Sequence, residues 1–114
     1  MTLPISILNS KHYLWGNDCD GWILFQRDDV SVIQERVPAG CSEVMHYHQF
    51  SRQFFFILEG QGTMVLKDQS VKLETGNGLE ITPGVPHQFA NQSHSEVRFI
   101  VISVPNNQVD RIDV

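Results

Sequence analysis

GCSEVMHYHQFSRQFFFILEG, residues 40–60, is the stretch that decides the fold. Between its two glycines lie two histidines, His46 and His48, followed by an apolar segment that begins at Gln53. Alternate residues of a β-strand point to the same face, so the two imidazoles would stand side by side, spaced for one metal ion. Neutral imidazole binds zinc, iron, nickel, copper and cobalt. The pair alone leaves open the alternative of two surface histidines on one strand.

Residues 53–58 are apolar at both parities of a strand. We therefore expect cover on both faces, as in one sheet of a two-sheet sandwich. The outer face would be covered by a second copy of the chain or, alternatively, by residues 15–25 of the same chain. Gln53 faces inward and must be satisfied there, either by a metal ion or by hydrogen bonds to backbone carbonyls or a histidine. The inward set is Gln53, Phe55 and Ile57, and the outward set is Phe54, Phe56 and Leu58.

The rest of the chain reads as short strands separated by turns, without a convincing helix of ten or more residues. This pattern predicts an all-β sandwich or barrel. Residues 111–114 are expected to form a tail. The expected strands are residues 22–26, 30–37, 43–48, 53–58, 63–67, 70–74, 79–82, 87–90 and 96–104.

A second motif, GNGLEITPGVPHQFAN, covers residues 76–91 and places His87 at the start of a strand. Together, residues 40–60 and 76–91 resemble the two motifs of the cupin superfamily. The first family motif is Gly, five residues, His-x-His, three or four residues, Glu, six residues, Gly. The second is Gly, five residues, Pro-x-Gly, two residues, His, three residues, Asn. The departures are Gln53 in place of Glu and Thr82 in place of Pro.

The resemblance implies a small single-domain cupin over residues 1–114, with the double-stranded β-helix (jelly-roll) barrel of that family. It also implies one divalent transition metal ion (zinc, iron, manganese, nickel or copper) held by His46, His48 and His87, and by Gln53 through its position in the motif. Glutamine adds no negative charge, so the ion would keep its full +2 charge and act as a stronger Lewis acid.

Residues that share the ligands' faces define a candidate pocket. Phe55, Ile57 and Phe89 would form an apolar, substrate-binding wall, and the alternative is that they only fill the barrel. No catalytic acid or base stands out from the sequence. Candidates for that role are Glu43, Tyr47 and Glu80.

Two further side-chain orientations stay open. On the strand 96–104, either Arg98 and its alternates point inward or Phe99, Val101 and Ser103 do. We favour the second because it buries no unpaired charge. Arg36 either faces the barrel, where it would bind a carboxylate or phosphate, or is a solvated edge charge, which we favour.

Composition limits the partners. The net charge is -5 and no run of lysines or arginines occurs, so no nucleic-acid partner is expected. Apolar runs are too short to cross a membrane, and the N-terminus does not resemble a signal peptide. Cys19 and Cys41 match no metal or redox spacing and are expected to be reduced thiols in a cytoplasmic protein. We also expect a homodimer that binds a small-molecule ligand.

The expected function is a metal-dependent enzyme of isomerase, lyase or dioxygenase type that acts on a small carbonyl compound or sugar-like substrate. The alternative is a non-catalytic cupin that binds or senses a small molecule or a metal. The sequence names neither the substrate nor the native metal, and it leaves open whether Gln53 touches the ion.

Overall fold

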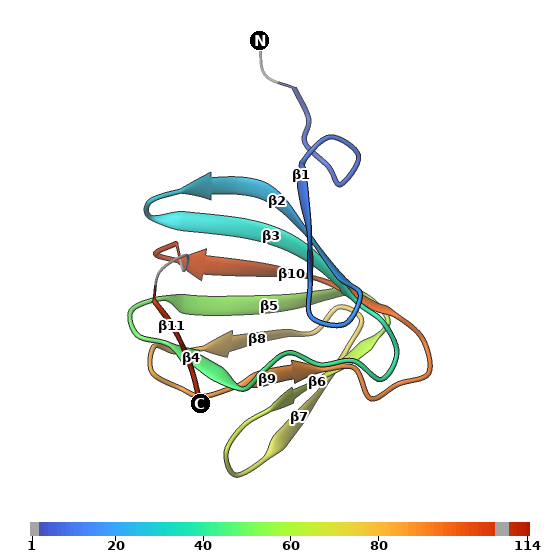
Figure 1. The fold of residues 1–114 in the computed structure, drawn as a ribbon, viewed down its shortest axis with the longest axis vertical. Coiled ribbons are helices and arrows are strands. Elements are labelled where there is room, and N and C mark those ends of the chain that lie inside the picture. The colour runs from blue at the N-terminus through green and yellow to red at the C-terminus, as the bar shows by residue number, and fades with distance from the viewer. Residues whose placement is uncertain (1–2, 107–109) are drawn as a thin grey trace.

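A computed structural model describes residues 3–106 and 110–114, and within them every regular element is a strand (Figure 1). Accordingly, the described residues include no helix long and apolar enough to cross a membrane. The strands are β1 (Lys11–Trp15), β2 (Cys19–Arg27), β3 (Val30–Val37), β4 (His46–His48), β5 (Arg52–Glu59), β6 (Gln61–Val65), β7 (Ser70–Glu74), β8 (Gly78–Ile81), β9 (Gln88–Ala90), β10 (Val97–Val104) and β11 (Arg111–Asp113).

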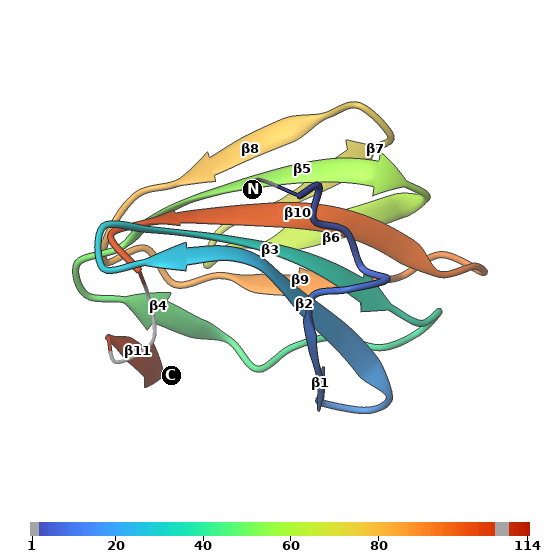
Figure 2. The ribbon, with the colours of Figure 1, turned by 90° about the horizontal axis from the view of Figure 1, so that it is seen from above.

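The strands form two facing layers, as Figure 2 shows from above. One layer is a six-stranded antiparallel sheet in the order β1-β2-β3-β10-β5-β8. The other contains the three-stranded sheet β7-β6-β9 and the two-stranded sheet β11-β4, joined by an isolated bridge between His46 and His87. This arrangement confirms the expected all-β, double-stranded β-helix barrel.

The core lies between the two layers. On β10 the buried residues alternate with half-buried ones, so that Phe99, Val101 and Ser103 point inward while Arg98 does not. This confirms the alternation that avoids burying an arginine. The rings of Phe89 and Phe99 stack across the core with their centroids 4.1 Å apart.

Within a single chain the outer face of β5 is left uncovered, so the alternative in which residues 15–25 cover it is wrong. Phe54, Phe56 and Leu58 are 42%, 38% and 40% exposed. Residues 15–25 do not cover them, because β1 and β2 extend the sheet beyond β3 instead of crossing over β5. Both faces of β5 are apolar, yet only the inner face is buried within a single chain.

The C-terminal segment also differs from the expected tail. β11 pairs antiparallel with β4, and this places Arg111 opposite His48. Strand β1 was likewise not predicted, and β4 is shorter than the expected strand 43–48. Such short strands carry too few residues for a two-residue periodicity to be visible.

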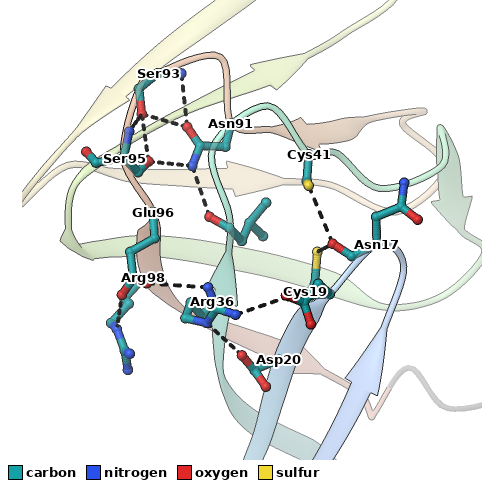
Figure 3. A network of polar contacts seen from close by, with 12 residues as sticks. Asn17, Cys19, Asp20, Arg36, Cys41, Asn91, Ser93, Ser95, Glu96 and Arg98 are labelled. Carbon is teal, nitrogen blue, oxygen red and sulfur yellow. Dashed lines mark hydrogen bonds and ion pairs between the residues drawn. The ribbon is translucent and has the colours of Figure 1, made fainter.

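Arg36 lies in a polar network at the edge of the barrel (Figure 3). Its Nε donates to Asp20 at 2.6 Å, and its Nη1 donates to Glu96 at 3.3 Å. Arg36 is therefore an ion-paired edge residue and not a ligand-binding group inside the barrel. In the same region Cys19 and Cys41 are free thiols, and both contact the carbonyl oxygen of Asn17.

Candidate metal centre

Three histidines converge at one place between the two layers. His46 and His48 come from β4, and His87 directly precedes β9. Backbone hydrogen bonds in both directions, 2.8 and 3.0 Å long, hold His46 against His87. One ring nitrogen from each histidine lies within 4.8 Å of the other two, and all three residues are buried. These nitrogens are close enough to bind a single ion.

The second nitrogen of each ring is already occupied. Nδ1 of His46 lies 2.7 Å from the carbonyl oxygen of Val44, and Nδ1 of His87 lies 2.9 Å from that of Val85. Nδ1 of His48 lies 3.0 Å from Oδ1 of Asp110. Because these partners only accept hydrogen bonds, they favour a proton on Nδ1 of each ring and turn Nε2 toward the centre of the cluster. Partners of this kind set the tautomer and orientation of metal-binding histidines in proteins.

Burial keeps these rings neutral. It lowers the pKa of His46 and of His87 to about 4, against the opposing effect of the Nδ1 hydrogen bonds. Burial also lowers the pKa of His48, although Asp110 opposes the shift. Metal binding requires neutral imidazole. At neutral pH the cluster is therefore ready to bind a cation without first losing protons.

Gln53 lies beside this cluster at the inner face of β5. Its Nε2 donates to Oγ of Ser103 at 3.1 Å, which turns Oε1 toward the histidines. Oε1 then lies 3.1 Å from Nε2 of His87. An amide oxygen and an imidazole nitrogen that lie this close together could bind the same ion. The residues therefore fit a transition metal with three imidazole ligands and one amide oxygen.

The structure adds Asp110, which sequence reasoning missed. Its Oδ2 accepts hydrogen bonds from the backbone N–H groups of Phe50 and Ser51 at 3.0 and 2.8 Å, while Oδ1 faces His48. Burial alone would raise the pKa of Asp110, but these hydrogen bonds together hold it below its usual value. No sequence signal links Asp110 to a histidine 62 residues earlier.

An open cavity of about 240 Å³ adjoins the histidines. This volume suits a small organic molecule. The residues that line it are Tyr13, Trp15, Ile33, Glu35, Glu43, His46, His48, Gln53, Phe55, Val101 and Arg111.

Of the expected substrate-binding residues, Phe55 lines the cavity, whereas Ile57 and Phe89 are fully buried in the core. Among the candidate acids and bases, Glu43 lines the cavity and Tyr47 does not. Glu80 is exposed and paired with Arg52 outside the cavity. The substrate and catalytic roles of these residues stay predictions. Tyr13, Glu35 and Arg111 are cavity residues that the sequence did not single out.

Comparisons with known proteins agree with the fold and the motifs. A family model described as "Cupin domain" matches residues 33–103. An uncharacterized protein of Methanocaldococcus jannaschii is 29% identical over 75 residues, which are 66% of this chain and 60% of the relative. Quercetin 2,3-dioxygenase of Bacillus subtilis is 33% identical over 63 residues, which are 55% of this chain and 19% of the enzyme. The chain therefore aligns with less than two thirds of each relative's length.

Among solved structures, the polyketide cyclase RemF of Streptomyces resistomycificus superposes with a TM-score of 0.84 at 19% sequence identity. The superposition covers 100% of this chain and 86% of RemF, and at this identity it supports the fold alone. The family model spans more than half of the chain and includes all three histidines and Gln53. The chain therefore belongs to the cupin family.

Proposed function

We propose that this protein is a metal-dependent enzyme that holds one divalent transition metal ion through Nε2 of His46, His48 and His87 and Oε1 of Gln53. The observation that carries the proposal is the convergence of three buried, neutral imidazoles whose Nδ1 atoms are all occupied by acceptors. A bound ion of this kind would polarise an oxygen atom of a substrate as a Lewis acid. The expected chemistry is of isomerase, lyase or dioxygenase type, on a small oxygenated organic molecule.

The remaining cavity residues would bind and orient that molecule. Phe55 and Val101 form apolar walls next to the histidines, and such walls exclude water from the carbon skeleton of a ligand. Glu43 accepts a hydrogen bond from the backbone N–H of Phe89 and faces the same cavity. Burial raises the pKa of Glu43 to about 7, in the range where a carboxyl group both gives and takes a proton near neutral pH.

Metal content is the first test. Protein purified without an affinity tag or chelator should contain about one equivalent of a transition metal, measured by elemental analysis. His87→Ala should lose it, because one of the three converging nitrogens is gone. His94→Ala is the matched control, since His94 is exposed and lies outside the cluster, and it should retain the metal. A wild-type protein that neither contains nor takes up metal would rule out the metalloenzyme.

Turnover separates an enzyme from a binding protein. Quercetin is a useful first compound because one relative is a quercetin 2,3-dioxygenase. Oxygen uptake that requires the metal and disappears in His87→Ala would assign the dioxygenase branch. Chemical change of a carbonyl compound without oxygen uptake would assign the isomerase or lyase branch. A bound but unchanged ligand in every case would favour the non-catalytic alternative.

We also propose that two copies of the chain pair through the outer face of the large sheet. Phe54, Phe56 and Leu58 form an exposed apolar row there, and such rows on sheet faces mark interaction surfaces. A dimer would have a light-scattering mass of about 26 kDa, twice the 13.0 kDa of one chain. Phe56→Lys should shift the mass toward one chain. A wild-type mass near 13.0 kDa would contradict the dimer.

A further inference from the structure

Three residues form a row across the edge of the large sheet. Tyr13 on β1 pairs with Gly21 on β2, and Gly21 pairs with Glu35 on β3. Cross-strand partners carry their side chains on the same face of a sheet. Tyr13 and Glu35 both line the cavity that His46 and His48 also line, so the row faces inward.

Gly21 lets the outer members of this row approach each other. A Cβ atom at Gly21 would lie 2.3 Å from Cζ and 2.6 Å from the hydroxyl oxygen of Tyr13, far inside contact distance. The phenol ring therefore occupies the space that a side chain would take on β2. This places the hydroxyl group above the middle strand, on the side of the neighbouring Glu35. Any larger residue at position 21 would push the ring out of this place.

Both polar groups lack a partner within the chain. Among residues 3–106 and 110–114, no hydrogen bond joins the Tyr13 hydroxyl or the Glu35 carboxyl to another protein group. Both residues are half-buried, and their polar atoms are not among the buried polar atoms without a partner, so they are open to the cavity and not sealed in the core. Unpaired groups that line a cavity beside a metal-binding cluster are available to a ligand.

The charges around the row favour a neutral carboxyl group. Burial, and then the neighbouring Glu43, raise the pKa of Glu35 to about 8, and Arg111 only partly opposes this. Burial, and then Glu35, raise the pKa of Tyr13. Near neutral pH both groups are therefore uncharged in the absence of a ligand. An uncharged carboxyl group and a phenol present donors and acceptors at the same place.

We propose that Tyr13 and Glu35 form a second binding position in the cavity, which takes a hydroxyl group of a ligand whose other oxygen atoms meet the histidine cluster. A hydroxyl group both donates and accepts, so it matches this pair better than a carboxylate or an ammonium group does. The same cavity is also lined by Trp15, Ile33 and Phe55, which suits an aromatic carbon skeleton. The substrate class is thus a hydroxylated aromatic compound. This inference rests on the proposed metal-dependent function.

The test uses probes that differ by a single hydroxyl group. Benzohydroxamic acid provides two oxygen atoms for a metal, and its 3-hydroxy and 4-hydroxy derivatives add a phenol at the far end. Dissociation constants are measured by calorimetry on zinc-loaded wild type, on Glu35→Leu, which removes both the donor and the acceptor, on Tyr13→Phe and on the control Glu74→Leu. Glu74 is exposed and lies outside the cavity. Zinc content is measured for each variant, so that weaker binding caused by loss of metal is distinguished from weaker binding at the second position.

At least one hydroxylated probe should bind the wild type roughly tenfold more tightly than benzohydroxamic acid, as expected for one well-formed hydrogen bond to such a group. In Glu35→Leu and Tyr13→Phe the hydroxylated probe should lose more affinity than benzohydroxamic acid does, so that the preference falls below about threefold while the zinc content stays that of the wild type. Glu74→Leu should behave like the wild type. Equal affinities for all probes on the wild type, or a full preference kept in Glu35→Leu or in Tyr13→Phe, would overturn the proposal.

A metal-free measurement keeps this test separate from the metal proposal. In protein labelled with ¹³C in its glutamate side chains, phenol should shift the carboxyl resonance of Glu35, and toluene, which has neither a donor nor an acceptor, should not. If the protein takes up no metal, the proposed function fails and this titration alone decides the second position. The absence of a shift with phenol would refute it.

Discussion

Replacement of Asp110 by asparagine tests how the histidine cluster is built. One carboxylate oxygen faces His48 and the other accepts two backbone N–H groups, from Phe50 and Ser51. Asparagine has only one acceptor oxygen. If that oxygen stays with the two N–H groups, the amide NH₂ turns toward Nδ1 of His48. A donor at Nδ1 favours the tautomer with the proton on Nε2, which cannot bind a metal.

The size of the effect follows from these contacts. Loss of a carboxylate that orients a metal-binding histidine weakens metal affinity roughly 10- to 100-fold, which is about 1.4 to 2.7 kcal/mol. The free energy of unfolding of the metal-free protein should fall by about 1–3 kcal/mol, because the bonds to Phe50 and Ser51 lose their charge assistance. The pKa of Asp110 is lowered in the folded state. The contribution of ionised Asp110 to the free energy of unfolding is therefore present above the pKa of the unfolded state, about 3.8, and is lost as pH falls below that value.

The assay is competition for zinc against a chromophoric chelator, combined with urea unfolding of the metal-free protein at pH 7 and at pH 3. Asp68→Asn is the matched control, because Asp68 is exposed and lies outside the cluster. The stability difference between Asp110→Asn and the wild type should shrink at pH 3. Unchanged zinc affinity in Asp110→Asn would refute the inference that this carboxylate fixes the tautomer of His48.

Three further predictions concern the cavity and the core. The pKa of Glu35 is raised to about 8 in the folded state. The stability of the wild type relative to that of Glu35→Gln should therefore fall as pH rises from 5 to 8, and parallel thermal melting profiles of the two proteins would contradict it. Gly21→Ala should displace the Tyr13 ring and abolish the preference for hydroxylated probes, and unchanged Tyr13 ring resonances in an NMR spectrum would count against the row. Phe99→Ala should lower the free energy of unfolding by about 3–5 kcal/mol in urea titrations, and a loss under about 1 kcal/mol would argue against its central place in the core.

Much of the histidine cluster could be predicted from the sequence because its residues lie in two short, local patterns. His46 and His48 share a face by strand alternation alone, and the spacing of the second motif brings in His87. The inward side of β10 was likewise predictable, since the other alternation would bury an arginine. These conclusions need only the period of a strand and the cost of burying charge.

The cover of the outward face of β5 could not be predicted from strand periodicity and burial cost. Because both faces of β5 are apolar, the sequence predicted that other residues cover each face. Whether the outer face is covered within the same chain depends on where β1 and β2 attach to the sheet. Their attachment beyond β3 is set by pairing between strands, which a single strand's composition does not encode.

The sequence by itself determined the family, the all-β architecture and the four residues proposed to hold the ion. Only the tertiary structure placed Asp110 behind His48, brought Arg111 to the cavity through β11, and laid Tyr13 over Gly21 toward Glu35. The physical reason is distance along the chain. The residues of a metal-binding motif lie close together in the sequence, and strand alternation places them on one face. The groups that orient a ligand or a histidine come from distant segments, which meet only in the folded barrel.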